Sequence, residues 1–173
     1  LLNMFDVNAP KIEGLPAGKP EDTVRLIKQL TGRPVGINLE PTDVGEEAQT
    51  DPLWQMSAGR RATLENARRA CDMGVDLILL TGNPGMGVSN EAIEATLKLY
   101  REELGDRVIL AAGKMHAAGV LAEAAEQIMT KEDVRRFREA GADVLLFPAP
   151  GTVPGITMEY VRELVAFAHG LGA

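Results

Sequence analysis

The sequence predicts an α/β protein of the (β/α)8 TIM-barrel type, in which parallel strands alternate with helices. Short apolar runs bounded by glycine or proline alternate with amphipathic helical patterns along the whole chain of 173 residues. A strand pattern also occurs twice, because residues 74–80 (GVDLILL) resemble residues 141–147 (GADVLLF), 67 positions later. This offset is about twice a strand–helix unit of roughly 30 residues, so another strand should lie between the two copies.

A complete barrel takes about 250 residues. We therefore expect residues 1–173 to be a single barrel-type domain with about five strand–helix units, truncated at both ends. The alternative is an open doubly wound sheet. Polar residues follow nearly every predicted strand, and a barrel brings all such strand ends to one mouth, which favours the barrel.

The predicted elements begin with the end of a strand in residues 1–6 and a helix between Pro20 and Gly32. A second strand over residues 35–39 leads into a long acidic segment, residues 41–61, which we interpret as either a mobile lid or a disordered loop. Three further strands are expected over residues 75–80, 108–112 and 141–147.

Polar side chains that can cap a helix precede the remaining helical patterns. The predicted caps are Thr63, Ser89 or Asn90, Thr130 in a capping box with Asp133, and Thr157 ahead of a helix from Met158. Apolar residues at helical spacing are expected to face the core. They are Val24, Ile27, Leu30, Leu64, Ala67, Ala70, Cys71, Ile93, Leu97, Tyr100, Leu104, Val134, Phe137, Ala140, Val161, Leu164, Val165 and Ala168.

Composition bounds the partners and the compartment. The formal net charge is −7 and no basic block stands out, so nucleic acid is not an expected partner. No apolar run approaches the roughly 20 residues of a membrane-spanning helix, so no membrane insertion is expected. A single cysteine, Cys71, cannot form an internal disulfide and fits a reducing cytoplasm. Its helical position predicts packing rather than nucleophilic chemistry.

Two glycine-rich loops follow the repeated strands, and each leads into a helix. Backbone N–H groups and the helix dipole converge at such a turn and favour a bound anion, although any strand–helix turn needs glycine and a cap. Asparagines at strand ends can add neutral hydrogen bonds to a polar ligand. The predicted ligand-binding residues are Asn3, Asn38, Thr81, Gly82, Asn83, Gly85, Gly87, Gly151 and Thr152.

Asp6 and Glu40 end two consecutive predicted strands, so their carboxylates should lie close together across the mouth. With Asn38 and water they suit Mg²⁺, which prefers oxygen ligands. They suit equally an acid/base pair. The remaining alternative is hydrogen bonding to loop amides or to Lys114.

Lys114 and His116 follow the fourth predicted strand and a glycine. A lysine at the barrel mouth can hold a phosphate or carboxylate, or form a Schiff base with a carbonyl if it is desolvated. His116 can transfer protons near neutral pH. The alternatives are a solvated lysine and a loop histidine bonded to backbone.

Four segments together, INLEPTD, LTGNPGMGVSNEAI, AGKMHAAGV and PAPGTVPGIT, resemble a family of uncharacterised bacterial barrel proteins. Its members carry labels such as haloacid-dehalogenase-like hydrolase or phosphonomutase-like protein. The resemblance covers nearly the whole chain and implies a full TIM barrel in the family, of which this chain would hold the central units.

We expect an enzyme that acts on a small phosphate- or carboxylate-bearing metabolite, with lyase-, isomerase- or aldolase-like chemistry. Lys114 would stabilise negative charge, and His116, Glu40 or Asp6 would transfer protons. One alternative is a metal-dependent hydrolase. Another is a non-catalytic ligand-binding or assembly protein, in which exposed sheet edges pair with another copy in a homo-oligomer.

Overall fold

Four strands form one parallel sheet in the sequential order β1-β2-β3-β4. The computed structural model describes residues 1–16, 18–42, 56–81, 88–114, 129–151 and 155–173. The strands in this part of the chain are β1 (Gly36–Leu39), β2 (Leu77–Leu80), β3 (Ile109–Gly113) and β4 (Val144–Leu146). The α/β class predicted from the sequence is confirmed.

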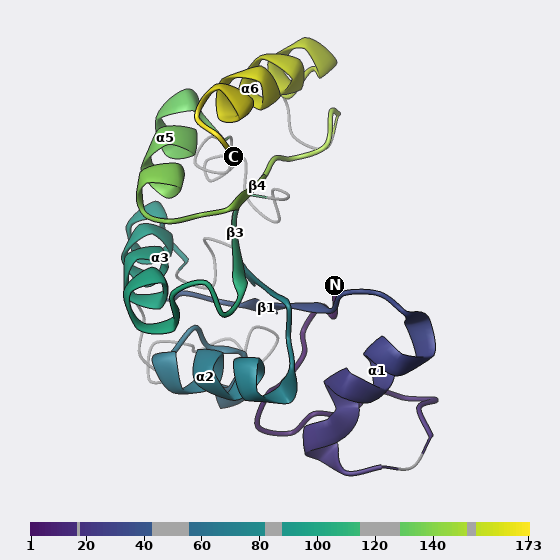
Figure 1. The fold of residues 1–173 in the computed structure, drawn as a ribbon. Helices are drawn as coiled ribbons and strands as arrows, with labels where there is room; N and C mark the ends of the chain where they lie inside the picture. The colour runs from purple at the N-terminus through teal and green to yellow at the C-terminus, as the bar shows by residue number, and fades with distance from the viewer. Residues whose placement is uncertain (17, 43–55, 82–87, 115–128, 152–154) are drawn as a thin grey trace.

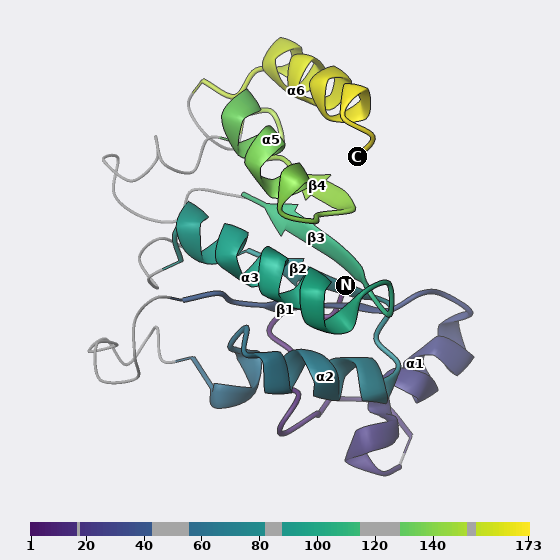
Figure 2. The same ribbon diagram turned by 60° about the vertical axis from the view of Figure 1, so that its left-hand side comes forward.

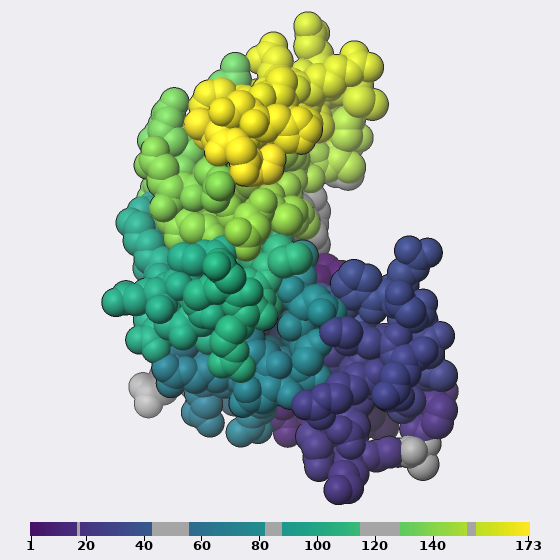
Figure 3. Space-filling model, viewed as in Figure 1, coloured from purple at the N-terminus to yellow at the C-terminus, as the bar shows by residue number. Residues whose placement is uncertain are grey.

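The helices of the described residues form a curved row on one side of the sheet. They are α1 (Thr23–Thr31), α2 (Leu64–Met73), α3 (Asn90–Leu104), α5 (Lys131–Glu139) and α6 (Met158–Gly170), with 3-10 turns η1 (Pro20–Asp22) and η4 (Ala58–Arg60). Figure 2 shows α2, α3 and α5 in front of the strands, and each helix packs against the next one in the chain. Figure 1 shows α1 and α6 at the two ends of this row. The space-filling view is hollowed on the other side, between these two ends (Figure 3).

The helices begin where the sequence predicts, because their caps are local. The hydroxyl oxygens of Thr63, Ser89, Thr130 and Thr157 each accept a hydrogen bond from the backbone N–H three residues later. Of the two alternatives before α3, Ser89 is the cap. Thr130 and Asp133 form the predicted capping box. These contacts satisfy N–H groups that the first helical turn leaves without intrahelical partners.

Alternate strand residues point toward the helices and form the core. Ile37, Ile78 and Leu110 are fully buried there and lie opposite one another in the parallel register. Most of the helical residues expected in the core are also buried. These confirmed core residues are Val24, Ala67, Ala70, Ile93, Leu97, Tyr100, Leu104, Val134, Phe137, Ala140, Leu164 and Ala168.

The other strand positions form a second face, which we call the inner face. It comprises Asn38, Glu40, Leu79, Thr81 and Ala111, which alternate with the core residues and lie on the side away from α2, α3 and α5. All five are buried. Toward the amino ends of the strands this face is less covered, since Ile109 is 45% and Val144 40% exposed. The amino ends of β3 and β4 are therefore partly open to solvent on this face.

The predicted strand over residues 1–6 is wrong beyond Leu2, which makes only an isolated parallel bridge with Ile37. Met4 has a φ of 58°, which turns the backbone out of the extended conformation. Its N–H donates to Asn38 Oδ1 at 2.9 Å instead of to a neighbouring strand. The chain therefore leaves the sheet at Met4, and the described sheet has four strands rather than five.

The predicted burial of Leu30 is also wrong, because this side chain is 59% exposed. Helix α1 lies at the end of the row of helices and packs on the core through Val24 and Ile27, so its last turn is left uncovered. Cys71 agrees better with its prediction, since it packs against the core while half-buried. Burial raises the pKa of its thiol, which disfavours the nucleophilic thiolate.

The repeated Gly-x-Asp segments make the same clamp at the amino ends of β2 and β4. Lys28 Nζ on α1 donates to Gly74 O at 3.1 Å and to Asp76 Oδ1 at 2.6 Å. The other Asp76 oxygen accepts from Val35 N, which precedes β1, at 2.7 Å. Each clamp therefore joins one helix and two adjacent strands.

The second clamp lies 67 residues later and joins the same kinds of group. The Arg101 guanidinium on α3 donates to Gly141 O at 2.7 Å and to Asp143 Oδ2 at 2.6 Å. The same carboxylate oxygen accepts from Leu110 N in β3 at 2.9 Å. The sequence repeat is thus a structural repeat of two strand–helix units.

The Asp76 clamp predicts a pH dependence of stability. Burial alone would raise the pKa of Asp76, but hydrogen bonds from Lys28 and from the Val35 amide lower it overall. A carboxyl whose folded pKa lies below its unfolded value near 3.8 stabilises the fold above that pH and loses this contribution as pH falls. Asp76→Asn should lower the unfolding free energy by about 1 kcal/mol at pH 7.

Urea unfolding at pH 7, 4 and 3 should show the difference between the Asp76→Asn variant and the unchanged protein shrinking below about pH 4. Glu102→Gln, an exposed change on α3, is the control and should leave the difference near zero at each pH. A gap for Asp76→Asn that stays constant down to pH 3 would contradict the ionic role of this clamp.

Candidate functional site

The carboxyl ends of the parallel strands meet at one edge of the sheet, as the sequence predicts for any parallel arrangement. Glu40 directly follows β1, Thr81 follows β2 and Lys114 follows β3. These three residues do not share a face. Glu40 and Thr81 alternate onto the inner face, whereas Lys114 continues the series of Leu110 and Ala112, which faces the helices.

Glu40 and Arg60 form a largely buried ion pair on the inner face. Glu40 is 4% exposed, and its Oε1 accepts a hydrogen bond from the Arg60 guanidinium. Asn38 Nδ2 donates to the same oxygen at 3.4 Å, while Asn38 Oδ1 holds the Met4 amide. Within the described residues, the buried Glu40 Oε2 and Arg60 Nε have no hydrogen-bond partner. In the described part of the chain, each member of the pair thus has a buried polar atom that is unsatisfied.

Backbone pairing holds Arg60 next to β1. Turn η4 carries Arg60, whose carbonyl oxygen accepts from Glu40 N at 2.9 Å. Glu40 O then accepts from Ala62 N at 3.0 Å, and Glu40 and Arg61 form a parallel bridge. Part of the segment interpreted as a lid or disordered loop is therefore an ordered extension of the sheet, while residues 43–55 lie outside the described residues.

Asp6 lies on the other side of this turn. Val7 N donates to Gly59 O at 3.2 Å, and a Cβ on Gly59 would lie 1.8 Å from Asp6 Oδ1, so only glycine fits. Burial tends to raise the pKa of Asp6, but hydrogen bonds from Ser57 and the Asn8 and Ala9 amides, with the charge of Arg60, lower it overall. Asp6 is therefore held as a carboxylate by its neighbours.

The predicted pairing of Asp6 with Glu40 thus takes a different form, since Arg60 is the charge that both carboxylates share. Asp6 bonds loop amides, which was the alternative to catalysis. Among the described residues, no three His, Cys, Asp or Glu side chains group as metal ligands. The Mg²⁺ site stays a prediction, and here a guanidinium supplies the positive charge next to Glu40.

Lys114 belongs to a second cluster, under the beginnings of α3 and α5. Its Nζ lies 3.4 Å from Asp133 Oδ2, and both side chains are about nine-tenths buried. Asp133 also accepts from the Thr130 amide and hydroxyl, each at 2.9 Å, and from Asn90 Nδ2 at 3.0 Å. Lys114 is thus not a solvated lysine. It lies on the helix-covered face of the sheet and Glu40 on the inner face, so this arrangement does not support the expectation that both contact one ligand.

The other predicted ligand-binding residues lie apart or outside the described chain. Asn38 and Thr81 are both buried on the inner face. Asn38 lies in β1, two residues before Glu40, and Thr81 follows the neighbouring strand β2. Asn3 is exposed in the turn before Met4, and Gly151 is exposed with its N–H donating to Ile156 O at 3.0 Å. The predictions outside the described residues are His116, Gly82, Asn83, Gly85, Gly87 and Thr152.

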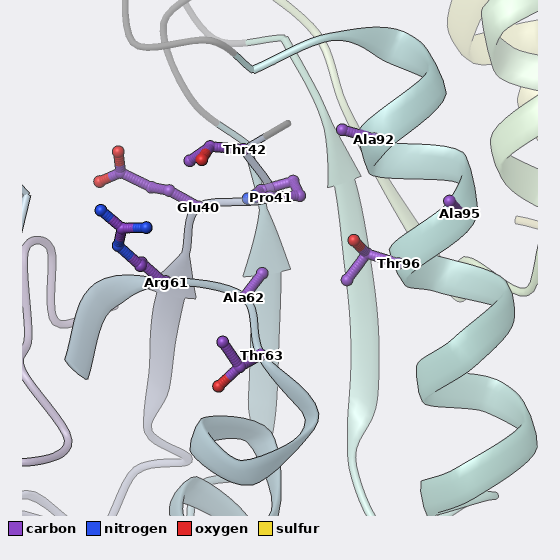
Figure 4. A pocket seen from close by; sticks show the side chains of 9 residues that line it. All are labelled: Glu40, Pro41, Thr42, Arg61, Ala62, Thr63, Ala92, Ala95 and Thr96. Atoms are coloured by element: carbon purple, nitrogen blue, oxygen red, sulfur yellow. The ribbon is translucent and has the colours of Figure 1, made fainter. Parts of the chain in front are cut away.

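A cavity of about 210 Å³ opens at the carboxyl end of β1. It lies between Pro41 and Thr42 on one side and Ala92, Ala95 and Thr96 of α3 on the other (Figure 4). The Glu40 and Arg61 side chains extend away from α3, toward the same side as each other (Figure 4). Glu40 and Arg61 also line this cavity, on the side opposite α3.

Sequence reasoning missed Arg60 and Arg61, because adjacent arginines after an acidic segment read as surface charge. The available signal was the order Gly59-Arg60-Arg61 directly ahead of the Thr63 cap. A glycine ahead of a helix cap can mark a turn whose backbone approaches another segment closely.

The sequence profile of a domain of unknown function, DUF7916, matches residues 1–173. The chain belongs to the DUF7916 family. No curated protein matches the chain. In the described part of this DUF7916 chain, no helix combines the length and the apolar character that a membrane span requires.

The second cluster generates a stability prediction. Asp133→Ala removes a buried partner of Lys114 and the capping box of α5, and should lower the unfolding free energy by about 3 kcal/mol. Glu132→Ala is the matched control, because Glu132 is exposed on the same turn and, within the described residues, pairs with exposed Arg135. That change should cost less than about 1 kcal/mol. Equal losses for the two variants in urea unfolding would contradict a buried, structural role for Asp133.

Proposed function

We propose that this DUF7916 chain binds a small phosphate- or carboxylate-bearing metabolite at the inner face and acts on it with lyase-, isomerase- or aldolase-like chemistry. The observation that carries the proposal is the unsatisfied Glu40–Arg60 pair at the carboxyl end of β1. Ligands of parallel α/β proteins bind at this edge, outside the carboxyl ends of the strands.

The proposed architecture is part of a (β/α)8 barrel. Sequential strand order supports it, because a doubly wound sheet reverses direction in its order whereas a barrel adds each strand beside the last. The row of helices on one face supports it as well (Figure 2). In a barrel the inner face would line the lumen, and Glu40 would lie at its mouth.

Three residues of the site have proposed tasks. Arg60 binds the anionic group of the metabolite, because a guanidinium presents donors that match carboxylate and phosphate oxygens. Glu40 transfers a proton through Oε2, which has no donor in the described structure. Asn38 positions Glu40 through the contact to Oε1. Lys114 lies outside this group, where its contact with Asp133 stabilises the start of α5.

The binding step predicts that Arg60 carries affinity for simple anions. Inorganic phosphate or propionate should bind the unchanged protein in isothermal titration. The double variant Arg60→Met with Glu40→Gln, which avoids leaving an unpaired buried charge, should bind at least about tenfold more weakly, because a charge-assisted hydrogen bond is lost. Arg33→Met, at an exposed arginine remote from the inner face, should bind unchanged. Unaltered affinity in the folded double variant would refute the anion site.

The catalytic step predicts proton exchange. Dihydroxyacetone phosphate incubated with the protein in D2O should exchange carbon-bound protons for deuterium. Proton NMR measures the rate of this exchange. Glu40→Gln should reduce the exchange rate about 10²–10⁴-fold, the range that general base catalysis contributes. Glu102→Gln on α3 is the control. Exchange that persists at the same rate in Glu40→Gln would leave Glu40 without the proposed role.

A further inference from the structure

We infer that the metabolite carries a hydrogen-bond donor, a hydroxyl or an ammonium, directly beside its anionic group. This inference rests on the proposed function of the Glu40–Arg60 site. It comes from counting the donors and acceptors that the buried pair leaves unused.

The carboxylate of Glu40 can only accept hydrogen bonds. Its Oε1 accepts from Arg60 and from Asn38, whereas its Oε2 is buried without a donor in the described residues. A ligand group that satisfies Oε2 must therefore donate. A fully ionised anionic group would be repelled from this oxygen, so a carboxylate or doubly ionised phosphate without a neighbouring donor leaves it unsatisfied.

The guanidinium of Arg60 can only donate. One terminal nitrogen donates to Glu40 Oε1, while the buried Nε has no acceptor in the described residues. A ligand group that satisfies Nε must accept, and a carboxylate or phosphate oxygen does so with the strength of a charge-assisted bond.

The two unsatisfied atoms belong to one ion pair, in which Arg60 donates to the other oxygen of the Glu40 carboxylate, so a small ligand that satisfies both must carry its donor and its acceptor close together. A 2-hydroxy acid, a 2-amino acid or a hydroxyalkyl phosphate has this arrangement, and a plain carboxylate does not. Sites that hydrogen-bond a ligand hydroxyl discriminate strongly against the analogue that lacks it, because the protein groups are then left buried and unpaired. The donor should therefore decide specificity at this site.

Lactate, alanine and propionate test this, since they differ at one substituent beside the carboxylate, which is hydroxyl, ammonium or hydrogen. Glycerol 3-phosphate and propyl phosphate form the matched phosphate pair. In isothermal titration of the unchanged protein, the donor-bearing member of at least one set should bind about tenfold or more tightly than its analogue. Whether lactate or alanine binds more tightly identifies the donor as hydroxyl or ammonium.

Two variants separate the donor from the anion. Glu40→Met keeps Arg60, so anions should still bind while the preference for a donor falls to below about threefold. Glu40→Gln keeps an acceptor oxygen without the charge, so it should retain a preference for lactate and lose one for alanine. Circular dichroism confirms folding, and Glu40→Gln serves alone if Glu40→Met does not fold. Glu102→Gln should preserve the full preference.

The failures are distinguishable. If all the probes bind, Arg60→Met with Glu40→Gln weakens them, and donor and donor-free analogues bind equally, the inference is overturned while the proposed function stands. If none of the probes binds, both are overturned. A crystal structure in which one water bridges Glu40 Oε2 and Arg60 Nε with a donor-bearing probe bound elsewhere would also overturn the inference, because that water would satisfy both atoms.

Discussion

Alternation of side chains along parallel strands is the constraint on which the arrangement of this protein depends. Apolar positions such as Ile37 and Ile78 must face the helices to form the core. Because side chains alternate along a strand, the residues between these positions must point to the inner face. This alternation places Asn38 and Glu40 on the inner face and sends Lys114 toward Asp133. Two polar residues can therefore follow neighbouring strands at one edge and still belong to separate clusters.

The two edges of the sheet carry different kinds of polar contact. At the amino edge, the clamps around Asp76 and Asp143 repeat the same bonds to a helix cation, a glycine carbonyl and a strand amide. They fix pairs of adjacent strands in register at positions that need no ligand. At the carboxyl edge, the described residues after β1 and β3 make different ion pairs, Glu40 with Arg60 and Lys114 with Asp133. In proteins built from strand–helix units, the residues at the amino edge typically stabilise the fold, whereas those at the carboxyl edge differ from one unit to the next.

The features that were predictable from the sequence are those set by neighbours in the chain. The Thr63 and Thr130 caps, the core spacing of α3 and the repeated Gly-x-Asp strands depend on contacts within a few residues. The site depends on contacts between residues far apart, such as Arg60 with Glu40 across 20 positions. Met4 shows the same limit, because an apolar run predicts a strand until a positive φ and a bond to Asn38 end it.

The Glu40–Arg60 pair is difficult to explain as a device for stability. Burying two charges costs desolvation energy that a pair recovers only when the remaining polar atoms are also bonded. Asp133 meets that condition, with four donors on its two oxygens. Glu40 and Arg60 do not meet it in the described chain, although apolar side chains of similar size could fill the same space. Natural proteins keep buried, unsatisfied polar atoms chiefly where function requires them. The unsatisfied atoms of Glu40 and Arg60 therefore favour this pair as the candidate functional site.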